Sequence, residues 1–113
     1  LDIGLSGTEE MYWAVSYFEA SAGIVVTASH NPIDYNGMKI VKFGSEPLNA
    51  DDFFKIRQIA ENESFKQTTR TGNFKNIRDE ARAEYVKKII SLIDLKCLKK
   101  KKILINSGNG AAG

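Results

Sequence analysis

The chain has 113 residues, of which 42% are hydrophobic and 27% are charged, and its formal net charge is +2 at pH 7. This composition is typical of a globular protein and excludes intrinsic disorder, collagen and disulfide-rich scaffolds. The single cysteine, Cys97, leaves no internal disulfide and no cysteine-based metal site, so we expect a reducing compartment, the cytoplasm. No apolar run approaches the ~20 residues of a membrane-spanning helix, so we expect no membrane partner.

The net charge conceals an asymmetry between the two halves of the chain. Residues 1–56 contain 3 basic and 8 acidic side chains, a net charge of −5, whereas residues 57–113 contain 13 and 6, a net charge of +7. The basic half includes four consecutive lysines at residues 99–102, but no aromatic residue is interleaved with them and no nucleic-acid recognition motif accompanies them. A solvated charge run is the favoured interpretation, and we expect no nucleic-acid partner.

The first half of the chain predicts one helix followed by two strands. Residues 8–20 place apolar side chains at helical spacing, with Ser6 or Thr8 as the cap and two glutamates in the first turn. Residues 23–28 are apolar and rich in β-branched side chains, which predicts a short buried strand. Residues 38–43 alternate apolar and basic side chains, which predicts a strand with one solvated, basic face.

A second helix is predicted over residues 51–62. Asn49 and Asp52 before and within its first turn have the spacing of a capping box. Apolar side chains at helical spacing define the face that we expect to be buried: Phe53, Ile56, Ile59 and Ala60.

The second half of the chain indicates a boundary between two parts. Residues 66–77 lack either periodicity and are rich in Thr, Asn, Gly and Lys, which indicates a linker. A third helix is predicted over residues 78–94, and residues 102–106 predict another buried strand. Helices that alternate with apolar strands indicate an α/β fold, in which helices layer on a mixed sheet. The linker divides the chain into residues 1–76 and 77–113.

Reactive side chains follow the first predicted strand. Ser29, His30, Asn31 and Pro32 come where this strand ends, which is the edge at which open α/β sheets bind ligands. A serine–histidine hydrolase pair is disfavoured, because adjacent residues on an extended chain point to opposite sides and no Gly-x-Ser-x-Gly elbow is present. The alternative is a structural turn in which Ser29 and Asn31 bond to the backbone.

Lys39 lies ten residues after Ser29, at the start of the second predicted strand. If the two strands are neighbours, its ammonium group lies close to the loop, where it can pair with a phosphate or exchange a proton with a sugar hydroxyl. The alternative is an ordinary surface lysine on the solvated face of the strand, like Lys42.

The chain closely resembles the α-D-phosphohexomutase superfamily, and within it the bacterial phosphomannomutase/phosphoglucomutase group, in four segments: SGTEE, TASHNP, DYNGMK and INSGNGAAG. The resemblance implies interconversion of mannose 6-phosphate and mannose 1-phosphate through an active-site phosphoserine and a bisphosphorylated hexose. The alternatives are activity on glucose or glucosamine phosphates, and a non-catalytic binding or structural piece. The resemblance also implies that residues 1–76 end the family's first domain and that residues 77–113 begin its second.

The same resemblance assigns roles to individual residues. Ser29 matches the phosphoserine, whose phosphate binds Mg²⁺, and His30 matches an imidazole that positions it or transfers a proton. Asn31 and Pro32 match the loop that shapes the serine, and Lys39 matches the proposed general acid/base. The family's Asp-x-Asp-x-Asp metal loop and its sugar-specificity loop do not occur in this sequence. We therefore expect a fragment that is inactive alone and depends on the remainder of its own chain to bind the metal and the hexose phosphate.

The last six residues, 108–113, fit the pattern G-x-G-x-x-G after a predicted strand, which is the context of a dinucleotide-binding turn. Glycines at this spacing also serve a tight strand-to-helix turn, and the segment resembles the start of the second mutase domain. We therefore expect no dinucleotide cofactor.

Overall fold

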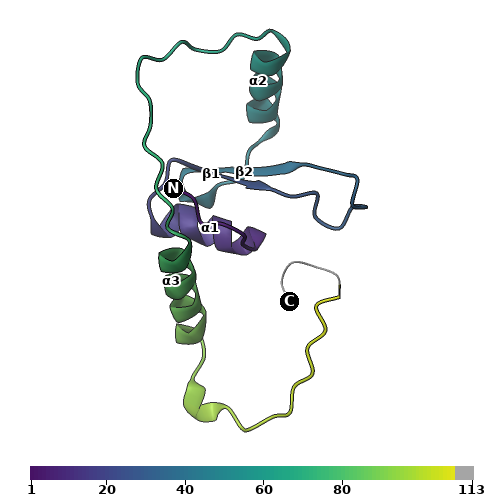
Figure 1. The fold of residues 1–113 in the computed structure, drawn as a ribbon, viewed down its shortest axis with the longest axis vertical. Coiled ribbons are helices and arrows are strands. Elements are labelled where there is room, and N and C mark those ends of the chain that lie inside the picture. Colours follow the sequence, from purple (N-terminus) through teal and green to yellow (C-terminus); the bar gives the residue numbers. More distant parts are fainter. Residues whose placement is uncertain (109–113) are drawn as a thin grey trace.

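The computed structural model describes residues 1–108. It confirms the predicted α/β class, because three α-helices accompany a two-stranded antiparallel sheet in the described residues (Figure 1). The predicted helices and strands before residue 95 are all present, with ends that shift by a few residues. In chain order the elements are α1 (Thr8–Tyr17), β1 (Ala22–Val26), β2 (Met38–Lys42), η1 (Phe43–Ser45), α2 (Ala50–Glu61), α3 (Arg78–Ser91) and η2 (Leu95–Cys97).

Helix α1 begins between the two predicted caps. Gly7 occupies the N-cap position, and its backbone N–H donates to the Glu10 carboxylate at 3.2 Å. The prediction of Ser6 or Thr8 as the cap is therefore wrong, because glycine is also tolerated at this position and the Glu10 side chain turns back to satisfy the start of the helix. The first-turn glutamates place negative charge at the positive end of the helix dipole, as expected.

Strands β1 and β2 form an antiparallel hairpin that ends with Val26 opposite Met38. Beyond this pair, the Thr27 N–H donates to the Gly37 carbonyl at 2.9 Å. The two backbone segments are so close there that a Cβ on Gly37 would lie 3.0 Å from the Thr27 carbonyl oxygen. Glycine at position 37 therefore allows the hairpin to close.

Helix α1 covers one face of this hairpin. Met11 and Val15 pack on Val41, whose side chain is only 1% exposed. The opposite face is open, with Ile24 and Val26 exposed by 60% and 71%. The predicted burial of the first strand is therefore wrong for the side chains on this open face.

Strand β2 does not collect its basic side chains on one face. Successive strand residues alternate between faces, so Lys39 shares the α1 side with Val41, while Met38 and Lys42 lie on the other side. Met38 is 65% exposed, although it is apolar. The prediction of a single solvated, basic face is wrong, because Lys39 and Lys42 are an odd number of residues apart.

The start of helix α2 is tied to strand β2. The predicted capping box is confirmed: the Asp52 N–H donates to Asn49 Oδ1 at 2.9 Å, and the Asn49 N–H donates to the Asp52 carboxylate at 3.2 Å. Lys42 Nζ lies 2.9 Å from a carboxylate oxygen of Asp52 and 2.9 Å from one of Glu46. The bonds to Glu46 and Asp52 raise the pKa of Lys42, and the Lys42 bond lowers the pKa of Asp52.

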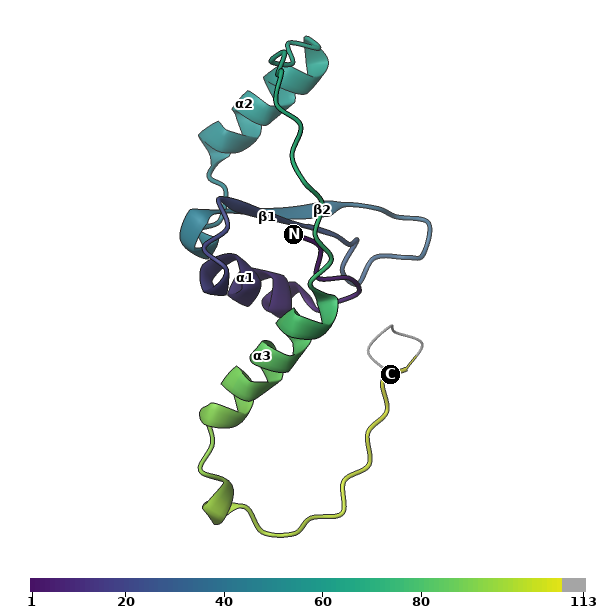
Figure 2. The same cartoon turned by 60° about the vertical axis from the view of Figure 1, so that its left-hand side comes forward.

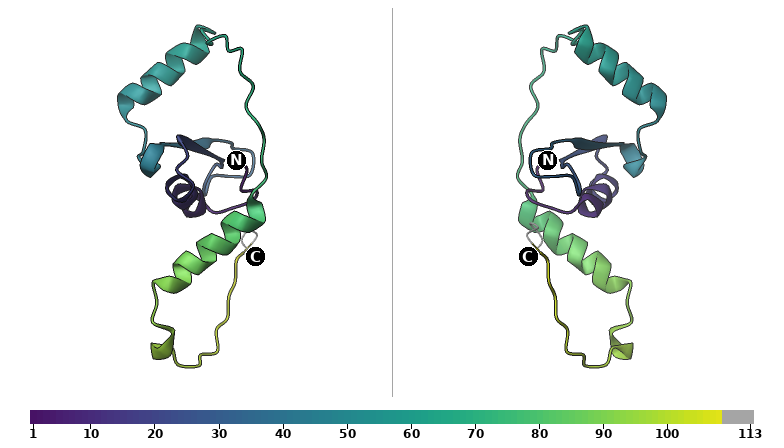
Figure 3. Two further views of the ribbon diagram at one scale, coloured as in Figure 1. Left: turned by 90° about the vertical axis from the view of Figure 1, so that its left-hand side faces the viewer. Right: turned by 90° about the vertical axis from the view of Figure 1, so that its right-hand side faces the viewer.

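Beyond this point every residue of α2, from 53 to 61, is exposed. The apolar face that was expected to be buried is exposed, with Phe53 and Ile59 at 56% and 45%. Figures 1 and 3 show α2 and α3 extending on opposite sides of the hairpin. The radius of gyration is 17.9 Å, compared with about 13 Å for a compact chain of this length. The described residues therefore leave several apolar faces uncovered.

The predicted linker leads the chain back to its own beginning. The Asp2 N–H donates to the Lys75 carbonyl at 2.9 Å, and the Ile77 N–H donates to the Asp2 carbonyl at 2.8 Å. Asp2 thereby forms a parallel bridge with Asn76. Ile77 is 4% exposed, so the linker ends in a buried anchor.

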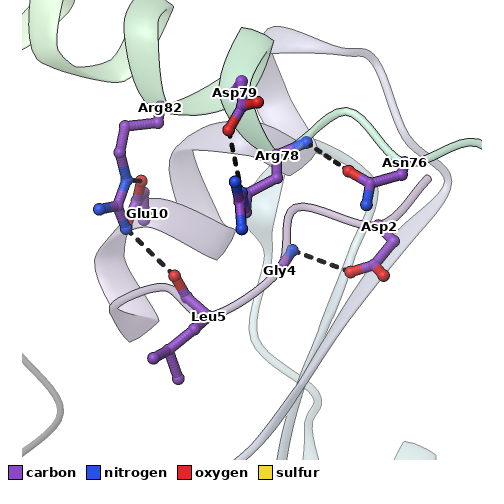
Figure 4. Close-up of polar contacts among 8 residues, drawn as sticks. All are labelled: Asp2, Gly4, Leu5, Glu10, Asn76, Arg78, Asp79 and Arg82. Atoms are coloured by element: carbon purple, nitrogen blue, oxygen red, sulfur yellow. Dashed lines mark hydrogen bonds and ion pairs between the residues drawn. The ribbon is translucent and has the colours of Figure 1, made fainter.

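Helix α3 follows this anchor and packs against α1. The Arg82 guanidinium lies 3.7 Å from the Glu10 carboxylate and donates to the Leu5 carbonyl at 3.1 Å (Figure 4). The Tyr17 hydroxyl donates to Glu84 at 3.1 Å, and this bond raises the pKa of Tyr17. The division of the chain into two domains after the linker stays a prediction.

The strand expected over residues 102–106 is not formed. Residues 98–107 have no regular structure, and Ile103, Leu104 and Ile105 are 75%, 97% and 81% exposed. A strand needs a neighbour to satisfy its N–H and C=O groups, and none of the described residues pairs with this segment. The glycine-rich turn expected at 108–113 lies outside the described residues from position 109 onward. Each of the helices that the structure describes is too short or too polar to cross a membrane.

Candidate active site in the loop between β1 and β2

The reactive residues predicted from the sequence lie in the loop that joins β1 to β2. This loop extends past the ends of both strands at one end of the hairpin (Figure 2). Ser29, His30 and Asn31 are all exposed, and Thr27 and Ala28 at the strand end are half-buried. The loop therefore presents its polar groups to solvent from a partly buried base.

Ser29 is at the centre of a tight turn. Its φ of 57° lies in the left-handed region, which is uncommon for residues other than glycine. Its backbone N–H donates to Thr27 Oγ1 at 3.0 Å, and its own Oγ lies 3.2 Å from His30 Nδ1. The expectation that Ser29 and His30 point to opposite sides is wrong, because the positive φ breaks the extended geometry on which that expectation rested.

Asn31 closes the turn from the other side. Its side-chain Nδ2 donates to the Ala28 carbonyl at 2.8 Å, and its backbone N–H donates to the same oxygen at 3.1 Å. The Tyr35 N–H donates to the Pro32 carbonyl at 3.0 Å, which turns the chain again. Asn31 thus bonds to the backbone as the turn interpretation expected, whereas the Ser29 hydroxyl faces the imidazole.

Lys39 is placed near the loop by the strand pairing. It stands opposite Val25, one pair inside the last pair of the hairpin, and its side chain is exposed. It forms no ion pair with any residue between 1 and 108. The structure does not bring Lys39 into hydrogen-bond contact with Ser29, and its assignment as an acid/base stays a prediction.

Sequence reasoning missed two features that shape this site, the hydroxyl of Thr27 and the close backbone approach at Gly37. Thr27 supplies the oxygen that accepts the Ser29 N–H, and Gly37 allows the close approach that ends the hairpin. A threonine two residues before a turn residue is a known signal for a side-chain-to-backbone turn, and an Asn-Gly pair is a known signal for chain reversal. Both signals are present in the sequence.

The described residues do not by themselves form a magnesium site. No three His, Cys, Asp or Glu side chains among residues 1–108 come close enough together to hold a metal ion. Ser29 carries one hydroxyl oxygen, and the charged oxygens that Mg²⁺ prefers would have to come from a phosphate on it and from carboxylates elsewhere.

Comparison with known proteins gives a consistent result. Residues 1–67 match the family described as phosphoglucomutase/phosphomannomutase, alpha/beta/alpha domain I. Over its whole length the chain is 47% identical to a phosphomannomutase from Vibrio cholerae and 45% identical to one from Escherichia coli, and it spans 24% and 25% of their lengths. It is 39% identical to a protein of Xanthomonas campestris named phosphohexose mutases, of which it spans 25%. The chain therefore belongs to the phosphoglucomutase/phosphomannomutase family.

Proposed function

We propose that this chain is the phosphoserine-bearing part of a phosphohexomutase that interconverts mannose 6-phosphate and mannose 1-phosphate. The observation that carries the proposal is the Ser29 hydroxyl, exposed at the tip of a hydrogen-bonded turn with His30 Nδ1 3.2 Å from it. Relatives named phosphomannomutase at 45–47% identity support mannose phosphates as the substrate. The family description also includes phosphoglucomutase, so glucose phosphates are the second substrate to be tested.

The reaction consists of two phosphoryl transfers through Ser29. In the first, a hydroxyl oxygen of the hexose monophosphate forms a bond to phosphorus and the Ser29 Oγ–P bond breaks, while the sugar hydroxyl gives up its proton and the released Ser29 Oγ gains one. In the second, Ser29 Oγ forms a bond to the other phosphorus of the bisphosphorylated hexose and the sugar O–P bond breaks, while Ser29 Oγ gives up its proton and the released sugar oxygen gains one. Such transfers pass through a loose transition state, so catalysis depends mainly on positioning and on neutralising charge.

Residues in the loop and at the start of β2 are proposed to supply positioning, proton transfer and positive charge. His30 lies within hydrogen-bond distance of Ser29 Oγ, so it can orient the hydroxyl and accept its proton. Lys39, on the strand that leaves the loop, is proposed to exchange the proton of the sugar hydroxyl and to pair with a phosphate. Asn31 and Pro32 shape the turn that presents the serine. Mg²⁺, when bound, supplies the positive charge that makes the phosphoserine a competent donor.

The remaining parts of the catalytic site are proposed to come from the rest of a longer chain. The described residues contain no metal-binding carboxylate cluster, and the chain spans about a quarter of its relatives. We therefore expect residues 1–113 to be inactive alone. We also propose that residues 1–76 and 77–113 belong to consecutive domains of that chain.

The test uses the full-length protein that contains this segment. It is incubated with a hexose 1,6-bisphosphate, and peptide mass spectrometry locates the phosphate, while coupled assays give kcat/KM for mannose 1-phosphate and glucose 1-phosphate. We expect phosphate on Ser29, and we expect Ser29→Ala to lose both the phosphate and the activity, whereas the exposed control Ser64→Ala keeps both. Full activity of Ser29→Ala would overturn the proposal, and a preference for glucose 1-phosphate would change the assigned substrate.

A further inference from the structure

We infer that Thr27 is a positioning residue for the phosphoryl-carrying serine, an inference that rests on the function proposed above. Thr27 is half-buried at the end of β1, and its Oγ1 accepts the Ser29 N–H at 3.0 Å. Its own N–H donates to the Gly37 carbonyl at 2.9 Å. Thr27 thus joins the last rung of the hairpin to the turn that carries the nucleophile.

The position of the Thr27 hydroxyl is fixed from two directions. Its backbone is held to the returning strand, because the Thr27 N–H donates to the Gly37 carbonyl at 2.9 Å. Its β-branched side chain has restricted rotation about χ1, which limits the directions that Oγ1 can take relative to that backbone. A rigid acceptor therefore defines where the Ser29 N–H points.

The Thr27 Oγ1 acceptor stabilises Ser29 in its left-handed backbone conformation. The left-handed region, in which Ser29 lies with a φ of 57°, is disfavoured for L-residues because Cβ approaches the following carbonyl oxygen. Without the Thr27 hydroxyl, the Ser29 N–H bonds to water equally well in other conformations. The Ser29 hydroxyl then leaves His30 for part of the time, and fewer molecules present it correctly for phosphoryl transfer.

The consequence is a defect in rate and not in substrate binding. Loss of one ordinary hydrogen bond corresponds to about a fivefold decrease in the equilibrium constant between the presenting conformation and the others. We therefore expect Thr27→Val to lower kcat and the rate of Ser29 phosphorylation by hexose 1,6-bisphosphate by up to about fivefold, with KM for the hexose phosphate unchanged. Thr27→Ser keeps the hydroxyl and should restore most of the rate.

The experiment is carried out on the full-length protein, with single-turnover phosphorylation of Ser29 followed by mass spectrometry and with a melting temperature for each variant. Thr69→Val removes a threonine hydroxyl from the exposed linker and is the matched control. Thr27→Ala differs from Thr27→Val in volume but shares the lost hydroxyl, so both should show the same decrease even if one of them is less stable.

Two results would overturn the inference. One is a wild-type phosphorylation rate in both Thr27→Val and Thr27→Ala, and the other is a Thr27→Ser variant as slow as they are. Failure of the proposed function has a different signature, because Ser29→Ala would then retain activity whatever the Thr27 variants do.

Discussion

Gly23 is expected to be intolerant of even one added methyl group. It lies in β1 directly beneath α1, where a Cβ would fall 2.5 Å from Met11 Sδ and well inside contact distance of Val15 Cγ2. Val15 is 4% exposed and β-branched, so it cannot rotate away. Overpacking of this kind costs up to about 3 kcal/mol, and replacing a strand glycine by alanine returns roughly 0.5–1 kcal/mol. We therefore expect Gly23→Ala to destabilise this layer by about 2 kcal/mol, or about 30-fold in its opening equilibrium.

Hydrogen exchange measured by mass spectrometry on peptides from α1 and β1 of the full-length protein gives this opening free energy locally. Gly72→Ala is the control, because no atom lies within 4 Å of the position its Cβ would occupy, and it should change stability by less than about 0.5 kcal/mol. Val15→Ala makes room for the new methyl group, so the double variant should be less destabilised than the sum of the single variants, by about 1 kcal/mol. Equal exchange in wild type and Gly23→Ala would show that the helix does not pack on the hairpin as described.

Two further predictions concern the start of α2. Removing the capping box with Asn49→Ala should destabilise the first turn of this helix by about 1 kcal/mol, whereas Asn49→Asp should be nearly neutral, as measured by hydrogen exchange in peptides covering that turn. The bonds to Lys42 hold the pKa of Asp52 below its ordinary 3.8, and those to Glu46 and Asp52 hold the pKa of Lys42 above its ordinary 10.5. The stabilisation from the Lys42–Asp52 ion pair should therefore be fully present between about pH 4 and pH 10. It should weaken as pH falls through the lowered pKa of Asp52, and also as pH rises through the raised pKa of Lys42. Asp52→Asn should remove the acid dependence, and an unchanged acid profile in that variant would contradict the assignment.

The features that were predicted correctly depend on neighbouring residues in the sequence. Helical spacing and the Asn49–Asp52 capping box are signals within a few residues, and both appear in the structure. Burial depends instead on what lies opposite a side chain in space. β1 and α2 were expected to be buried from their composition, yet Ile24 and Phe53 are exposed because no described element covers them. The missing strand at 102–106 has the same cause, since a strand forms only with a partner.

The geometry of the candidate site was mispredicted for a different reason. The sequence places Ser29 and His30 side by side, and an extended backbone would separate their side chains. Whether the backbone is extended depends on the hydrogen bond from the Ser29 N–H to Thr27, which the types of the two reactive residues do not reveal. The position of the candidate loop directly after β1 was thus predictable, whereas its hydrogen-bond geometry was not.

The bonds that hold the site also differ in range from those that hold the fold. Ser29 and Asn31 are fixed by partners no more than three residues away, and the loop is closed by the hairpin rung at Gly37. The contacts of α1 and α3, by contrast, join residues more than 60 positions apart, such as Tyr17 and Glu84. A turn maintained by local bonds can keep the serine and imidazole together while the surrounding apolar faces remain open. For this reason variants at Thr27 are expected to act on the rate of phosphoryl transfer, and variants at Gly23 on stability.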